Sequence, residues 1–107
     1  MKKSTMYLIL REDLAYKYIQ GAHALAEFAD SYPKTFHKWN NQYLICLSVF
    51  NGVALKEIYK KFAKLPNKYE YRSFSEPDLD NTITAICFYN NSYKFNRIIK
   101  KLHLATK

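Results

Sequence analysis

The feature that most constrains the fold is an apolar run at residues 43–50, interrupted by a single polar side chain, Ser48. A run of this length without alternation predicts a strand that is buried on both faces, at the centre of a sheet. Asn51 and Gly52 follow directly and predict its end. The segments on both sides have helical periodicity, so we expect this strand to be covered by helices.

Three further segments predict strands. Residues 6–10 form a short apolar run, residues 69–74 are rich in aromatic side chains, and residues 82–88 are apolar and β-branched. Alternation along the last strand puts Thr82, Thr84 and Ile86 on one face, and Ile83, Ala85 and Cys87 on the other.

Helices are predicted between these strands. Asp13 is suited to cap a helix over residues 14–32, which Pro33 would end. The small side chains that follow Ile19 at helical spacing, at positions 22, 26 and 29, would let this helix approach the sheet closely. Residues 54–65 and 93–102 form two more amphipathic helices, and residues 34–42 form a short helix or a turn.

The order of the segments predicts one α/β domain over residues 1–107, a three-layer sandwich with a four-stranded mixed sheet and helices on both faces. The first apolar run is too short for a signal peptide, and no segment approaches a membrane span. We therefore expect a soluble, cytoplasmic protein with no membrane partner. Whether it forms a homodimer through an apolar sheet edge or helix stays open.

The two cysteines, Cys46 and Cys87, lie inside apolar runs and are expected to be buried in strands without a disulfide. No spacing of cysteine and histidine suits a metal ion, and no glycine-rich phosphate loop is present. The sequence predicts neither a metal nor an organic cofactor.

The net charge of +8 is concentrated after residue 50, where 11 basic and 5 acidic residues lie. Such a charge suggests tRNA or another polyanion as a partner, and a solvated lysine-rich surface is the alternative. The basic side chains form one face on each of the two later helices. They are Lys56, Lys60, Lys61 and Lys64 on the first, and Lys94, Arg97, Lys100 and Lys101 on the second.

A polar patch is predicted near the start of the first helix. Gln20 and His23 are one helical turn apart and share a face. Gly21 costs a helix about 1 kcal/mol relative to alanine, so it needs a reason of packing or access. His23 could line a site with Gln20, or it could be buried or paired with Glu27.

An acidic turn over residues 76–81 follows the third predicted strand. Pro77 holds Glu76 out of helical geometry. Asp78 and Asp80 could bond their own backbone, or one carboxylate could point over the sheet edge toward the polar patch. There it would orient a water, hold a lysine or bind a ribose hydroxyl, with Thr82 or Thr84 bonding the substrate.

These elements together give the chain a diffuse resemblance to the type-two peptidyl-tRNA hydrolases, which hydrolyse the ester between peptide and tRNA. The turn at residues 11–14 resembles the family's Arg-x-Asp-Leu turn, and residues 20–24 match its Gln-x-x-His-Ala element. Trp39 and Gln42 precede the second strand as in the family, and Asp78 precedes Thr82 by four residues.

The resemblance implies roles for these side chains. Asp78 would position a water or a lysine, Lys17 would stabilise negative charge on the ester, and Thr82 would bond the substrate. The residues that would bind the substrate or support its pocket are Tyr16, Gln20, His23, Glu76, Asp80 and Thr84.

One departure from the family keeps a second function open. The family has lysine four residues before the helix glutamine, where this chain has Tyr16, and Lys17 lies about 100° further round the helix. The alternative is therefore a catalytically inactive module of the same fold that binds RNA, a nucleotide or a protein.

Overall fold

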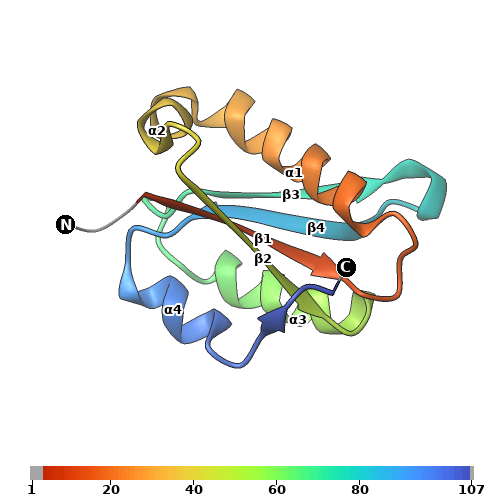
Figure 1. The fold of residues 1–107 in the computed structure, drawn as a ribbon. Helices are drawn as coiled ribbons and strands as arrows, with labels where there is room; N and C mark the ends of the chain where they lie inside the picture. Colours follow the sequence, from red (N-terminus) through yellow and green to blue (C-terminus); the bar gives the residue numbers. More distant parts are fainter. Residues whose placement is uncertain (1–3, 107) are drawn as a thin grey trace.

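The computed structural model describes residues 4–106. The elements follow one another as an alternation of strands and helices (Figure 1). They are β1 (Thr5–Arg11), α1 (Lys17–Ser31), α2 (Pro33–Trp39), β2 (Tyr43–Val49), α3 (Gly52–Ala63), β3 (Tyr71–Glu76), the short 3-10 helix η1 (Pro77–Leu79), β4 (Thr82–Tyr89), α4 (Tyr93–Ile99) and β5 (His103–Leu104).

The sheet has five strands in the order β3-β4-β1-β2-β5, so the prediction of four strands is wrong. β1 runs parallel to β2, and the other three pairings are antiparallel. The fifth strand is β5, which pairs only with Leu47 and Ser48 of β2. Its two residues are both exposed, so they leave no hydrophobic pattern that could predict a strand.

Helices cover both faces of the sheet, as expected for a three-layer α/β sandwich. Helices α1 and α2 lie on one face, and α3 and α4 lie on the other (Figure 1). Each face has its own core. Phe28 and Trp39 pack with Leu8 and Leu10 on the α1 side, and Phe62 leads the core on the α3 side.

Helix α1 begins at Lys17, three residues later than expected, and Asp13 does not cap it. The Asp13 carboxylate accepts hydrogen bonds from the guanidinium of Arg11 at 3.0 and 2.8 Å instead. Because this two-pronged pair with arginine engages both oxygens of the carboxylate, it holds Asp13 in the turn after β1. Tyr16 occupies the N-cap position without a side-chain cap bond.

The buried face of α1 also differs from the expected one. It consists of Lys17, Gln20, Gly21, Ala24 and Phe28, while Ile19 and the alanines at positions 22 and 26 are exposed. Small side chains allow close approach from either face, so their spacing alone does not show which stripe meets the sheet.

Several chain segments meet where β1 and β2 end, which we call the carboxyl edge of the sheet. The N-termini of α1 and α3 begin there, and the β3–β4 turn lies beside them (Figure 1). Residue 12 donates its backbone N–H to Val49 at 3.0 Å, and Arg11 donates to the carbonyl of Ile83 at 3.1 Å. In open α/β sheets this edge is where ligands usually bind.

Candidate functional site

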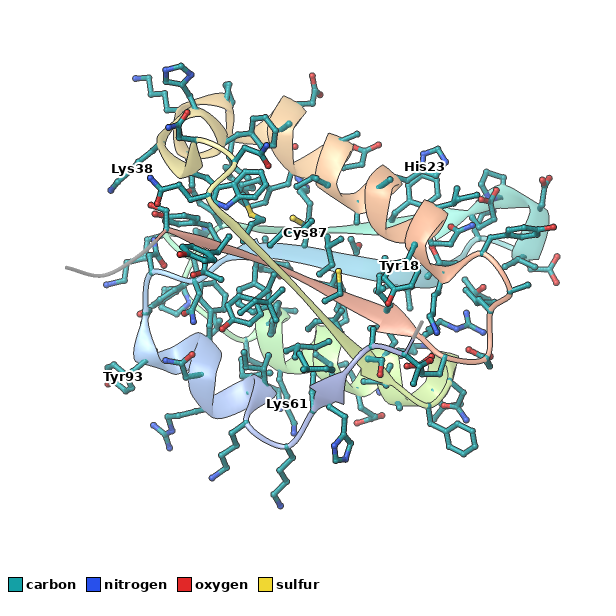
Figure 2. All side chains as sticks on the ribbon, in the orientation of Figure 1. Tyr18, His23, Lys38, Lys61, Cys87 and Tyr93 are labelled. Atoms are coloured by element: carbon teal, nitrogen blue, oxygen red, sulfur yellow. The ribbon has the colours of Figure 1, made fainter. Side chains whose placement is uncertain are left out.

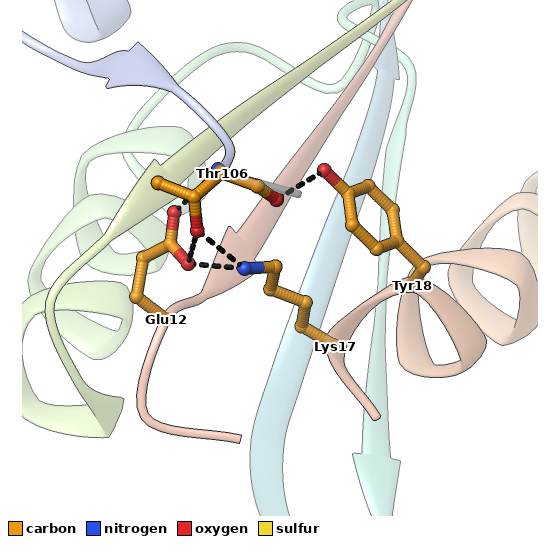
Figure 3. A network of polar contacts seen from close by, with 4 residues as sticks. All are labelled: Glu12, Lys17, Tyr18 and Thr106. Atoms are coloured by element: carbon orange, nitrogen blue, oxygen red, sulfur yellow. Dashed lines mark hydrogen bonds and ion pairs between the residues drawn. The ribbon is translucent and has the colours of Figure 1, made fainter. Parts of the chain in front are cut away.

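Lys17 is buried in a polar network at the carboxyl edge (Figure 3). The side chain projects from the first turn of α1, and the residue is only 9% exposed. Its ammonium group contacts the Glu12 carboxylate and donates a hydrogen bond of 2.7 Å to the hydroxyl of Thr106. The lysine that the resemblance assigns to charge stabilisation is therefore already paired.

Thr106 joins the end of the chain to this network. Its backbone N–H and its hydroxyl donate to the two oxygens of Glu12 at 2.8 and 2.7 Å. The hydroxyl of Tyr18 donates to the Thr106 carbonyl at 2.6 Å (Figure 3). The segment 103–106, which we call the C-terminal strap, thus lies over the start of α1.

The environment of Glu12 stabilises its charged form. The hydrogen bond from Lys17, and then those from the backbone and side chain of Thr106, lower the pKa of Glu12 to about 2. The carboxylate is therefore ionised at neutral pH, and it neutralises the charge of Lys17.

Gln20, Thr84 and Glu76 form a second chain of hydrogen bonds one helical turn further along α1. The Thr84 hydroxyl donates to the Gln20 side-chain oxygen at 2.8 Å and lies 3.2 Å from the Phe74 carbonyl. The Gln20 amide donates to the Glu76 carboxylate at 3.3 Å. Three side chains predicted from the sequence to bind substrate or support its pocket are thus brought together.

A β-bulge places Thr84 in this chain. Phe74 pairs with Ala85 and Ser75 pairs with Ile83, so Thr84 is the extra residue in β4. The predicted alternation along β4 is therefore wrong, because Thr84 and Ala85 both face α1. Bulges re-aim side chains, and this one turns a hydroxyl toward Gln20.

His23 is exposed on α1, neither buried nor paired with Glu27. Its ring stacks on that of Phe74, with the centroids 4.5 Å apart and the planes at 13°. Figure 2 shows it on the outer side of α1, toward the β3–β4 turn. The imidazole therefore belongs to the same patch as Gln20.

The acidic turn lies apart from Lys17. Asp78 is exposed in η1, and its backbone N–H lies 3.4 Å from the Glu76 carboxylate. Within residues 4–106, no hydrogen bond or ion pair joins Lys17 to Asp78. Tyr16, next to Lys17, is 69% exposed.

Asp80 and Thr82 line a groove on the α3 side instead. This groove of about 510 Å³ also contains Arg11, Gly52 and Lys56. Asp80 and Thr82 therefore face a different surface from Glu76, which accepts a hydrogen bond from Gln20 of α1.

The basic faces of α3 and α4 meet in one groove. It has a volume of about 350 Å³ and is lined by Lys61, Lys64, Lys94 and Arg97, with Leu65 and Ile98. Lys61 lies on the same side of the sheet as α4 in Figure 2. Sequence periodicity identified both faces but could not show that they adjoin. We call this the basic groove.

The described part of the chain contains neither a cluster of metal ligands nor a membrane-spanning helix. No three side chains of histidine, cysteine, aspartate or glutamate within residues 4–106 could together hold a metal ion. Over the same residues, no helix is long and apolar enough to cross a membrane.

Comparisons with known proteins identify a similar fold but no family. No protein-family model and no curated protein sequence matches the chain. The structure of a protein of unknown function, Atu0240 from Agrobacterium tumefaciens strain C58, has a TM-score of 0.63 and 14% sequence identity. The match covers 99% of this chain and 100% of that one. At this identity, the likeness concerns the fold alone.

Proposed function

We propose that the protein binds RNA, with tRNA as the expected class, through the basic groove between α3 and α4. The observation that carries this proposal is the convergence of Lys61, Lys64, Lys94 and Arg97 on one groove that no carboxylate of residues 4–106 lines. Like charges that line one groove repel one another, and the phosphates of an RNA backbone would neutralise them. The RNA releases its own counterions when these side chains replace them.

The pairing of Lys17 favours binding over catalysis. A group that stabilises an oxyanion must aim free N–H donors at the reacting atoms. Lys17 instead contacts Glu12 and Thr106 and is buried. A module of this α/β fold that binds RNA needs no free lysine at that position.

The test is a titration of labelled tRNA between about 50 and 200 mM salt. Four phosphate contacts give a slope of roughly −3 in log affinity against log salt. The double variant Lys64→Ala/Lys94→Ala should weaken binding and reduce the slope by nearly two. The matched control is Lys34→Ala/Lys38→Ala on α2, which has exposed lysines on the other face of the sheet. Equal losses in both variants, or no binding at low salt, would contradict the proposal.

Peptidyl-tRNA hydrolysis is a second candidate, favoured by the chain of Thr84, Gln20 and Glu76 next to Lys17. On this hypothesis the C-terminal strap moves when substrate binds, and Lys17 then faces the ester. The test is cleavage of peptidyl-tRNA at high enzyme concentration, by the wild type and by Lys17→Ala and Asp78→Ala. Turnover that either variant abolishes supports hydrolysis. Absence of turnover, with intact tRNA binding, excludes it.

A further inference from the structure

A small cavity rich in tyrosine lies at the outer edge of the sheet, where the loop after α3 leads into β3. It has a volume of about 220 Å³ and includes Tyr32, Tyr59, Asn67, Tyr71 and Arg72 in its lining. We call it the tyrosine pocket. Cavities for drug-sized ligands have about 300–1,000 Å³, so this one suits a smaller planar group.

The lining of the tyrosine pocket offers hydrogen-bond donors and aromatic surface. Burial raises the pKa of the Tyr71 phenol, and the neighbouring phenols of Tyr59 and Tyr32 raise it further. The Tyr71 phenol is therefore protonated at neutral pH, and its ring centre lies 6.0 Å from that of Tyr59. A phenol hydroxyl can both donate and accept a hydrogen bond. Asn67 adds an amide with both capacities.

Arg72 supplies a positive charge and further N–H donors of its guanidinium besides the one on Nε. Its Nε donates to the Ser31 hydroxyl at 2.8 Å, and its guanidinium lies 5.7 Å from the centre of the Tyr32 ring. Within residues 4–106 it forms no ion pair with a carboxylate. The neighbouring Glu70 does not line the pocket, and its carboxylate accepts from Thr35.

The tyrosine pocket lies beside the basic groove. Leu65 lines both cavities. Tyr69 lines the pocket, and the ammonium groups of Lys68 and Lys94 lie 5.4 and 5.7 Å from the centre of its ring. Because Lys94 also lines the groove, a strand that follows the groove would pass close to the pocket.

We propose that the tyrosine pocket takes one unpaired nucleobase from the RNA strand whose phosphates lie in the basic groove. This inference rests on the proposed function and narrows it to RNA with a single-stranded segment. Basic grooves that track a backbone and aromatic side chains that hold its bases are the usual combination for single strands. The phenols and Asn67 bond the base edge, and Arg72 binds the adjacent phosphate.

The test compares a single-stranded RNA with the duplex of the same sequence. We expect tighter binding of the single strand. Tyr59→Ala should weaken it roughly tenfold, with a smaller loss for Tyr71→Phe, and both should leave the salt slope unchanged. Tyr93→Phe, an exposed tyrosine on α4, is the matched control. Circular dichroism checks that each variant folds.

Failure of this inference is distinguishable from failure of the proposed function. If RNA binds with the expected salt slope, but single strand and duplex bind equally and the pocket variants behave like Tyr93→Phe, the inference is wrong and RNA binding stands. If no RNA binds at low salt, both are wrong.

A titration with adenosine monophosphate, followed by NMR, should shift the resonances of Tyr71 and Arg72 before those of Tyr93. Shifts confined to Tyr93 would overturn the inference.

Discussion

Gly21 brings α1 into close contact with β1. A Cβ at this position would lie 2.8 Å from a terminal methyl carbon of Leu10 and 3.0 Å from one of Leu8. Both leucines are buried, so neither can move freely. The sequence indicated that this glycine needs a reason of packing or access, and packing is the reason. The leucines that impose it lie on another element, so only the fold could identify them.

We expect Gly21→Ala to destabilise the protein by about 1 kcal/mol, since overpacking of about 1–3 kcal/mol exceeds a gain in helix propensity of about 1 kcal/mol. Urea unfolding measures the change. Leu10→Ala should relieve the clash, so the double variant should lose less than the sum of the two single variants. Simple additivity would show that the methyl group does not clash.

Glu12 makes stability depend on pH in a defined range. Its pKa is lowered from 4.5 to about 2 by Lys17 and Thr106, so its contribution to stability is complete above pH 4.5 and is lost as the pH falls toward 2. Glu12→Gln should therefore lower the melting temperature at neutral pH, with the difference from wild type shrinking in acid.

The control for Glu12 is Glu57→Gln, which removes a carboxylate from an exposed pair with Lys60. Exposed pairs of this kind contribute about 0–1 kcal/mol, so little change is expected at any pH. A Glu12→Gln variant with a melting temperature parallel to that of wild type from neutral pH to pH 2 would contradict the assignment.

At the scale of elements, β4 shows that a sequence pattern can predict a strand correctly and still misassign the face on which a side chain lies. Its apolar and β-branched residues predict a strand, and its bounds agree with the structure to within a residue. The alternation rule misassigns Thr84, because a bulge arises from pairing with β3 and leaves no local signature. The candidate site depends on that bulge, so its geometry could not be predicted from the sequence.

Thr84→Val should destabilise the protein by about 1–3 kcal/mol, because it leaves the buried oxygen of Gln20 without its donor. Thr82→Val in the same strand is the control, since Thr82 is exposed. Chemical unfolding of the two variants measures the difference. Equal stability would mean that the Gln20 oxygen finds another donor.

For the helices too, the sequence predicts that an element is present more reliably than it predicts where the element begins and ends. Helices α3 and α4 were predicted from periodicity, although α3 begins at Gly52 and α4 already ends at Ile99. Asn51 caps α3 by accepting from the backbone of Ala54 at 3.0 Å. For α1, the start was mispredicted because Arg11 binds the expected capping residue, and this bond could be inferred only with the turn in place.

At the scale of the whole molecule, the C-terminal strap decides how accessible Lys17 is. Three side chains of residues 12–18 bond Thr106, which gave no sequence signal because the contact depends on how the whole sheet assembles. The resemblance directed attention to Lys17 and Asp78. It gave no indication that Thr106 forms a hydrogen bond with Lys17.

Lys17 should react with an acylating reagent far more slowly than Lys38, which is exposed on α2. The double variant Tyr18→Phe/Thr106→Ala removes the hydroxyls that hold the strap, so it should raise the rate at Lys17 several-fold and leave Lys38 unchanged. Mass spectrometry of digested protein measures both rates. Equal rates at the two lysines in the wild type would show that the strap does not cover Lys17.

The bond between Glu12 and Thr106 also joins residues 94 positions apart. Closing a loop of that length costs more entropy than forming any neighbouring turn, and contacts of this kind slow folding. We therefore expect the strap, which includes β5, to dock after the other four strands have paired and to detach before they separate, in a local opening that leaves the rest folded. On a nascent chain, Lys17 would stay open to solvent until Thr106 has left the ribosome.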